Sequence, residues 1–214
     1  MTKKLILKEL DRYSIGTYAD VIYRNALFRA NQEVFISGDK RITFAVFNDR
    51  VNSLIHALQS MGLKKGDGIG ILSWNCLECT DITGAAMKGG FIVSPFNPRM
   101  QKNELEYLIN YSEVKVLFVG PELMGMANEL RPVLKKTHYV ALEQKAYNMV
   151  FHDDLLASHS KEEPDVDVKE TDPFIIFYTS GTTGMPRGAV YTHFRKMEEA
   201  KNKIVQVGLK PANK

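Results

Sequence analysis

The chain has 214 residues, of which 44% are hydrophobic and 25% are charged, which is typical of a globular protein with a sizeable core. Its 28 basic and 25 acidic residues give a net charge of +3, so the charge balance offers no reason to expect a nucleic-acid partner. The chain shows no secretory signal and no stretch near the roughly 18 apolar residues of a membrane-spanning helix, and we therefore expect a cytoplasmic protein without a transmembrane segment.

The N-terminal part predicts two helices separated by a hairpin. Thr17 is a candidate N-cap for a helix that extends to about residue 29. Two apolar segments, 34–37 and 41–44, flank a Gly-Asp-Lys sequence that suits the tight turn of a hairpin. Apolar residues then recur every three or four positions from Phe47 to Met61, which predicts a second helix that ends at Gly62.

Between residues 67 and 142 the predicted strands alternate with predicted helices. We expect strands at 67–72, 91–93, 114–119 and 138–142, and helices at 77–88, 104–111 and 121–136. Such alternation is typical of α/β proteins with parallel strands. We therefore predict an α/β fold with a mixed, largely parallel sheet flanked by helices.

A polar segment at 158–172 has the composition of a surface linker. The apolar run that follows it, 174–178, predicts a central strand buried on both faces. A mostly polar helix is expected from Phe194 to about Gly208. We place a domain boundary in the linker: residues 1–165 would form an N-terminal α/β subdomain, and residues 166–214 would carry the strand, its loop and the helix as the start of the next subdomain.

The segment after this strand is rich in hydroxyl side chains and glycine. Its candidate phosphate-binding residues are Thr179, Ser180, Gly181, Thr182, Thr183, Gly184 and Arg187. Glycine permits a tight turn, successive backbone N–H groups form an anion-binding concavity, and arginine presents a fork of donors to phosphate. Ligand sites of α/β sheets lie at the carboxyl ends of strands, where this loop is expected. We interpret it as a triphosphate-binding loop. A surface loop without a ligand is the alternative.

The loop fits neither the P-loop pattern nor the dinucleotide fingerprint. Instead, residues 178–188, Y-T-S-G-T-T-G-M-P-R-G, with Thr192-His193 after them, resemble the nucleotide-binding signature of the adenylate-forming (AMP-binding) superfamily, which includes acyl-CoA synthetases. Residues 95–99, P-F-N-P-R, resemble a Pro-Leu-Asn-Pro-Arg turn of the same family. The resemblance extends from about Thr17 to the C-terminus, and its pattern is closest to that of fatty-acyl-CoA ligases.

The resemblance implies the N-terminal part of an acyl-CoA synthetase. In that family, a carboxylate attacks the α-phosphate of Mg²⁺-bound ATP, which gives an acyl adenylate and pyrophosphate, and the thiol of coenzyme A then displaces AMP. A small-molecule carboxylic acid, ATP, Mg²⁺ and coenzyme A would therefore be the partners of the full-length parent. The loop hydroxyls and Arg187 would hold the β- and γ-phosphates.

The sequence departs from the family in two respects. Arg187 stands where the family has lysine, and the chain has less than half the length of family members, without their Mg²⁺-binding glutamate, ribose-binding aspartate or catalytic lysine. We therefore expect a cloned fragment or a natural truncation, with an incomplete fold, no catalytic residue and no metal ligand. A cut sheet would expose a strand edge, which favours a homodimer or a disordered loop. A non-catalytic binding or interaction module is the alternative function.

The remaining candidate residues are interpreted structurally. Cys76 and Cys79 have the spacing of a redox pair or half a zinc site, but without further cysteines we favour two reduced packing residues on one helix face. His152 lies beside Asp153 and Asp154, and this pair is expected to be a helix-entry pair on a solvated surface rather than part of a metal site. His193 is expected to have a structural or supporting role near the loop, and Trp74 is expected in the core.

Overall fold

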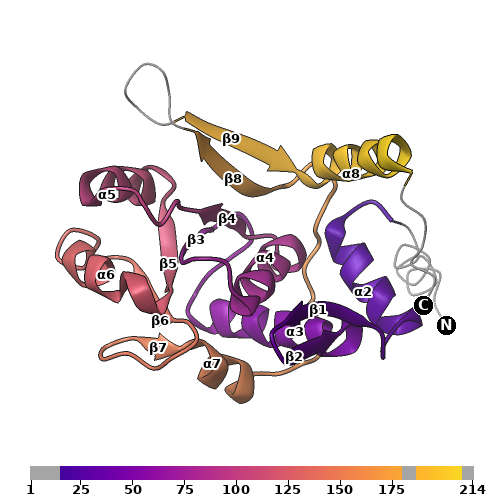
Figure 1. Ribbon diagram of the computed structural model, residues 1–214, viewed down its shortest axis with the longest axis horizontal. Helices are drawn as coiled ribbons and strands as arrows, with labels where there is room; N and C mark the ends of the chain where they lie inside the picture. The colour runs from indigo at the N-terminus through magenta and orange to yellow at the C-terminus, as the bar shows by residue number, and fades with distance from the viewer. Residues whose placement is uncertain (1–14, 180–186, 209–214) are drawn as a thin grey trace.

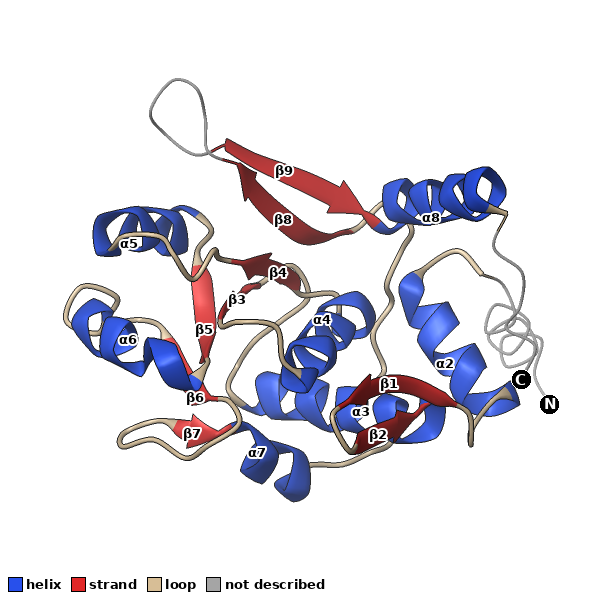
Figure 2. Ribbon diagram, viewed as in Figure 1, coloured by secondary structure: helices blue, strands red, loops and turns tan. Residues whose placement is uncertain are grey.

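The computed structural model describes residues 15–179 and 187–208. Figure 1 shows a twisted sheet with helices on both sides, and the strands and helices are distinguished by colour in Figure 2. Helices α5 (Lys102–Tyr111) and α6 (Met124–Leu130) cover one face of the sheet. Helices α3 (Phe44–Ser60) and α4 (Leu77–Gly89) cover the other face. The predicted α/β architecture is therefore confirmed.

The two N-terminal helices begin where the sequence places their caps. Helix α2 (Tyr18–Phe28) follows Thr17, whose hydroxyl accepts the N–H of Asp20 at 3.2 Å, while the Asp20 carboxylate accepts the N–H of Thr17 at 2.7 Å. This reciprocal arrangement is a capping box, which satisfies donors that the first helical turn leaves unpaired. The hairpin of β1 (Glu33–Ser37) and β2 (Lys40–Thr43) lies between α2 and α3, as predicted.

The main sheet has the strand order β7-β6-β5-β3-β4-β8-β9. The strands not yet introduced are β3 (Gly68–Leu72), β4 (Ile92–Pro95), β5 (Val114–Val119), β6 (His138–Ala141), β7 (Val150–Phe151), β8 (Pro173–Thr179) and β9 (Arg187–Thr192). All neighbouring pairs are parallel except β8 and β9, which are antiparallel. The prediction of a mixed, largely parallel sheet is thus confirmed.

The alternation of side chains along β5 divides the core between the two faces. Val116 and Phe118 pack in the cluster that includes α3 and α4, whereas Leu117 and Val119 pack in the cluster that includes α5 and α6. All four side chains are fully buried, as expected for a central strand of a parallel sheet. Helices α3 and α4 approach closely at Gly84, where an added Cβ would lie 2.5 Å from Val51.

The following elements differ from the sequence-based prediction. The helix expected at 121–136 is a short 3₁₀ turn, Pro121–Leu123, followed by α6, which ends before Pro132 because proline lacks the N–H that a helix needs. Strand β7 was not predicted because it is short, and helix α7 (His152–Ser158) was anticipated only through the aspartate pair at its start. Strand β9 was not predicted either. Helix α8 (His193–Val207), followed by Gly208, confirms the expected polar helix.

Strand β8 does not have the predicted burial. Only Phe174 and Ile175 are buried, and Phe177 is 39% exposed. The prediction of a strand buried on both faces was therefore wrong, because β8 meets β4 at the single register pair Val93–Ile175 and otherwise pairs with β9. In Figure 1 the β8–β9 ribbon projects from the sheet.

One single-residue expectation was also wrong: Trp74 is 46% exposed rather than in the core, and the Arg99 guanidinium lies 5.4 Å from its ring centroid. Asp153 and Asp154 are exposed in the first turn of α7, as expected. The neighbouring His152 is fully buried, with Nε2 3.6 Å from the Asp81 carboxylate.

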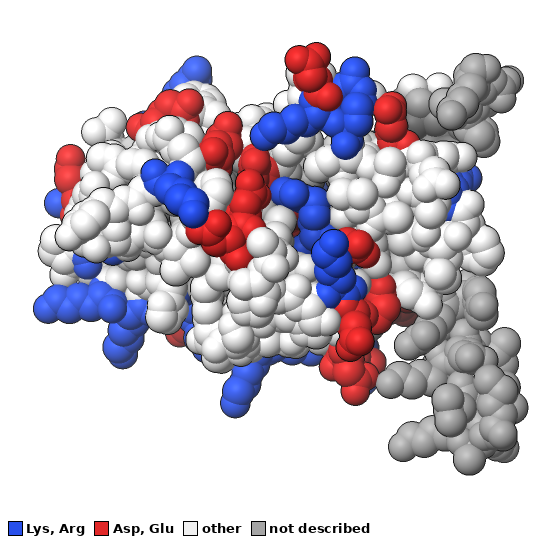
Figure 3. All heavy atoms as spheres, turned by 90° about the horizontal axis from the view of Figure 1, so that it is seen from below, with Lys and Arg blue, Asp and Glu red and all other residues white. Residues whose placement is uncertain are grey.

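No helix within residues 15–179 and 187–208 combines the length and the apolarity needed to cross a bilayer. On the face shown in Figure 3, acidic and basic side chains are interspersed.

Candidate phosphate-binding site

The ends of the predicted loop are fixed by the last pair of the β8–β9 ladder. Thr179 and Arg187 are register partners, and the Thr179 hydroxyl donates to the Arg187 carbonyl at 3.4 Å. Both residues are exposed. The other candidate residues, Ser180, Gly181, Thr182, Thr183 and Gly184, lie outside the described residues. Of the seven candidates, the structure therefore places the two that bracket the loop.

The loop leaves β8 at the carboxyl edge of the parallel sheet. Because β8 is parallel to β4, and β4 to β3, the segments that follow all three strands emerge at the same edge. Ligands of open α/β sheets bind at this edge, where connecting segments converge. The topology thus agrees with the position expected for a phosphate-binding loop.

Tyr178 anchors the start of the loop to the rest of the sheet. Its hydroxyl lies 2.8 Å from Ser112 Oγ at the end of α5, and because Ser112 donates to the Leu108 carbonyl, the tyrosine is the donor. Its ring stacks on Phe96, with centroids 6.0 Å apart and planes 17° from parallel. Phe96 belongs to the P-F-N-P-R turn, so this contact joins two of the sequence motifs. Neither motif alone predicts the contact.

Gly188 is required by packing on the facing strand. It is the register partner of Tyr178, and a Cβ at this position would lie 2.9 Å from Ile176 Cγ2 and 3.1 Å from the Tyr178 ring. A larger residue would displace the tyrosine that anchors β8. Gly188, the last glycine of the motif, therefore has a structural explanation that requires no ligand.

His193 connects the end of this region to helix α2. It is fully buried at the start of α8, and its Nδ1 accepts the backbone N–H of Tyr18 at 3.1 Å. Its ring centroid lies 4.8 Å from that of Phe174. Burial lowers the pKa of His193 to about 4, so the ring is neutral near pH 7 and carries its proton on Nε2. These contacts give His193 a structural position, as expected.

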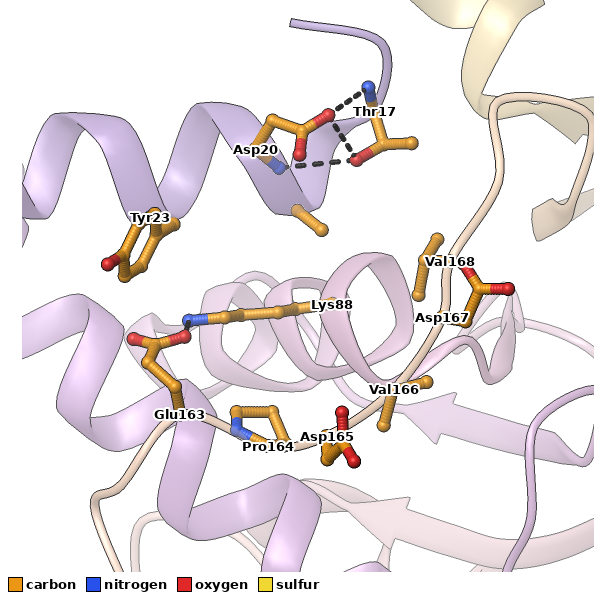
Figure 4. Close-up of a pocket in the computed structure, with 11 residues that line it drawn as sticks. Thr17, Asp20, Tyr23, Lys88, Glu163, Pro164, Asp165, Val166, Asp167 and Val168 are labelled. Atoms are coloured by element: carbon orange, nitrogen blue, oxygen red, sulfur yellow. Dashed lines mark hydrogen bonds and ion pairs between the residues drawn. The ribbon is translucent and has the colours of Figure 1, made fainter. Parts of the chain in front are cut away.

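A separate polar pocket of about 420 Å³ lies between α2, α4 and the linker at 159–172 (Figure 4). Lys88 extends along it and meets Glu163 of the linker at 2.5 Å, and it donates to Asn48 of α3. No sequence pattern indicates that this lysine is buried, because α4 also carries Glu78 and Asp81. Neither Thr179 nor Arg187 lines the pocket, and the ion pair explains how the linker is held against the helices.

Within the described ranges, no group of three or more His, Cys, Asp or Glu side chains is arranged to hold a metal ion. His152 instead lies near Asp81 and Asp153, and the Arg50 guanidinium makes hydrogen bonds of 2.7–3.2 Å to both oxygens of the buried Asp81.

Comparison with known proteins decides the family. The sequence model of the AMP-binding enzyme family matches residues 22–210, which is most of the chain. The chain belongs to this family. The AMP-binding relatives include a long-chain-fatty-acid–CoA ligase of Thermus thermophilus, 31% identical over 155 residues, which covers 72% of this chain and 28% of the relative. A 3-oxocholest-4-en-26-oate–CoA ligase of Rhodococcus rhodochrous is 31% identical over 183 residues and covers 82% of this chain and 33% of the relative.

Solved structures of the family share the fold. A fatty acyl CoA synthetase of Mycobacterium tuberculosis superposes with a TM-score of 0.73 at 26% identity, over 83% of this chain and 35% of that protein. The chain thus spans about a third of the length of the curated relatives named above. The aligned part is the N-terminal α/β portion of an adenylate-forming enzyme.

Proposed function

We propose that this AMP-binding chain is the N-terminal part of an ATP-dependent acyl-CoA ligase and that its β8–β9 loop holds the β- and γ-phosphates of ATP. The observation that carries the proposal is the Thr179–Arg187 pair, which closes a Ser/Thr/Gly-rich loop at the carboxyl edge of the sheet. The anchor formed by Tyr178 on Phe96 supports it, because a phosphate-binding loop needs a fixed base.

The proposed chemistry needs charge neutralisation at the phosphates. When a carboxylate oxygen attacks the α-phosphorus of ATP, the bond to the β-phosphate oxygen breaks and pyrophosphate leaves with added negative charge. Fixed donors at that position stabilise the transition state more than water does. Arg187 offers a permanent charge and a fork of N–H groups, and Thr179 offers a hydroxyl. The sulfur of coenzyme A would then attack the acyl carbon, and AMP would leave.

Arg187 stands where the family has lysine and would bind phosphate with a different hydrogen-bond geometry. A guanidinium can bridge two oxygens, whereas an ammonium acts as a point charge. We propose that phosphate binding is retained with an altered affinity. In the whole protein that carries these residues, Arg187→Lys should change the KM for ATP, and unchanged KM and kcat would contradict a specific role for arginine.

We propose further that these 214 residues do not complete the reaction by themselves. The resemblance assigns the Mg²⁺-binding glutamate, the ribose-binding aspartate and the catalytic lysine to motifs that this sequence does not contain. No step of the mechanism is therefore assigned to a metal ligand of this chain. The division at residues 165 and 166 into two subdomains and the cytoplasmic location remain part of the proposal.

The test is carboxylate-dependent exchange of labelled pyrophosphate into ATP. The acids should include long-chain and medium-chain fatty acids, because relatives carry those names. We expect exchange with the whole protein and none with the 214 residues alone. Exchange by the purified 214 residues would overturn the proposed inactivity. ATP binding by the whole protein without exchange for any acid would instead favour a non-catalytic binding or interaction module.

A further inference from the structure

Cys76 and Cys79 lie together at the start of helix α4, away from the phosphate loop in the sequence. Cys76 is the N-cap residue of the helix, with extended backbone angles, and Cys79 is in the first turn. Both are free thiols, both are partly buried, and their sulfur atoms are 3.2 Å apart. A disulfide has an S–S length of about 2 Å, so the two sulfurs need to approach by only about one ångström.

The two thiols have different environments. A hydrogen bond from the Cys76 side chain lowers the pKa of Cys79, and the same contact, together with burial, raises the pKa of Cys76. The Glu78 carboxylate between them opposes the ionisation of both. The partial positive charge of a helix N-terminus favours a thiolate in the first turn. Cys79 is therefore the better nucleophile of the pair, and Cys76 is placed to attack next.

Small reagents have a route to the pair. Cys76 and Cys79 line an apolar groove of about 490 Å³, together with Tyr18 and Val21 of α2 and Phe35 of β1. Both cysteines are partly buried against the core and also line this groove, so a small reagent in the groove would lie beside them.

We propose that Cys76 and Cys79 form a reversible dithiol–disulfide pair. The Cys79 thiolate attacks one sulfur of a small disulfide such as oxidised glutathione, whose S–S bond breaks and releases one glutathione. The Cys76 sulfur then attacks Cys79 of the mixed disulfide, which forms the intramolecular bond and releases the second glutathione. The chain loses two electrons and two protons, and the glutathione disulfide gains them. A reduced thiol reverses both steps.

The test is a redox titration of the purified 214-residue chain. The chain is equilibrated in buffers of varied reduced-to-oxidised glutathione ratio, quenched in acid, alkylated under denaturing conditions and weighed by mass spectrometry. We expect the native chain to change between a doubly alkylated form and a form that lacks both labels and two hydrogens, with one midpoint, reached from both directions. Two alkylatable thiols at every ratio, or oxidation only after urea unfolding, would overturn the proposal.

Single substitutions identify the roles of the two thiols. Cys76→Ser keeps an N-cap residue and a donor to Cys79, and this variant should stop at a mixed disulfide with one glutathione. In Cys79→Ser, the remaining Cys76 should react with iodoacetamide more slowly than Cys79 does in Cys76→Ser, because burial still raises the pKa of Cys76 and the helix N-terminus still favours a Cys79 thiolate. Equal rates would overturn the assignment of Cys79 as the nucleophile. Circular dichroism checks that both variants are folded.

Discussion

Two regions of the molecule differ sharply in how they are stabilised. The N-terminal block, residues 15–158, has a core on both faces of its parallel strands. The hairpin–helix segment, residues 173–207, contributes few buried residues: in β9 none is buried, and in α8 only His193 is. The proposed phosphate loop therefore belongs to a segment that depends on a few contacts with the N-terminal block, mainly through Tyr178, Phe174 and His193. The comparison predicts that substitutions have large effects in the block and small ones in the segment, except at these contacts.

The largest effect is expected at Asp81. Its side chain is fully buried, and its substitution by alanine leaves the Arg50 charge without its main partner. Removing one member of a buried ion pair costs about 3–5 kcal/mol, so Asp81→Ala should reduce the free energy of unfolding in urea by that amount. Glu198→Ala in α8 is the matched control, because Glu198 pairs with Lys201 on the surface and such pairs contribute less than about 1 kcal/mol. Similar losses in the two variants would contradict the comparison.

The next effect tests the junction between the regions. The folded-state pKa of His193 is about 4, below the unfolded value, so acid protonates the unfolded chain first. The contribution of neutral His193 to the free energy of unfolding is complete above pH 6.5 and is lost as the pH falls through 4. At about 1.4 kcal/mol per pKa unit, this contribution totals near 3 kcal/mol. His193→Asn keeps an acceptor for Tyr18 and should flatten this part of the stability profile. If the free energy of unfolding varied with pH in the same way in the wild type and the variant, protonation of His193 would not control the stability of the junction.

A smaller effect distinguishes tight from open packing inside the N-terminal block. Gly84→Ala places a Cβ within 2.5 Å of Val51 and 2.9 Å of Phe47, and overpacking of this kind costs about 1–3 kcal/mol. Gly125→Ala in α6 meets no atom within 4 Å and should stabilise the chain by about 0.5–1 kcal/mol through helix propensity. The midpoints of thermal unfolding should therefore shift in opposite directions. Shifts of the same sign would refute the close contact of α3 and α4.

The smallest effect on stability is expected at the edge strand β9. Val190 is 59% exposed, so Val190→Lys should change the free energy of unfolding by less than about 0.5 kcal/mol. We expect the chain to dimerise through this unpaired edge, and a lysine there should favour the monomer. Light scattering measures both states. A wild-type monomer at micromolar concentration would contradict the expected dimer.

Periodicity and capping residues in the sequence identified most elements of the N-terminal block. The apolar run at 174–178 led to a wrong prediction of burial because a continuous apolar run does not show whether both faces of a strand are covered. Strand β8 pairs mainly with β9, and only two of its residues are buried. The prediction for Trp74 was wrong for a related reason: residue type predicts average burial, whereas the direction of one side chain depends on neighbours distant in sequence.

The candidate site was identified from the motif, but its supports were not. The contacts of Tyr178 with Phe96 and Ser112 join residues 66 or more positions apart, which no local pattern reveals. The same holds for the Lys88–Glu163 pair, which links positions 75 apart. The sequence motif thus proposes which residues would contact a ligand, and the fold is needed to see what holds them.

The most direct test of the phosphate loop is titration calorimetry of pyrophosphate into the purified chain. We expect weak binding by the wild type and at least a roughly tenfold loss of affinity in Arg187→Gln, because a hydrogen bond to a charged group contributes about 1.5–3 kcal/mol. Arg195→Gln, an exposed arginine of α8, should bind like the wild type. Binding that is absent in the wild type, or equal in all three proteins, would contradict the assignment of the β8–β9 loop as the phosphate site.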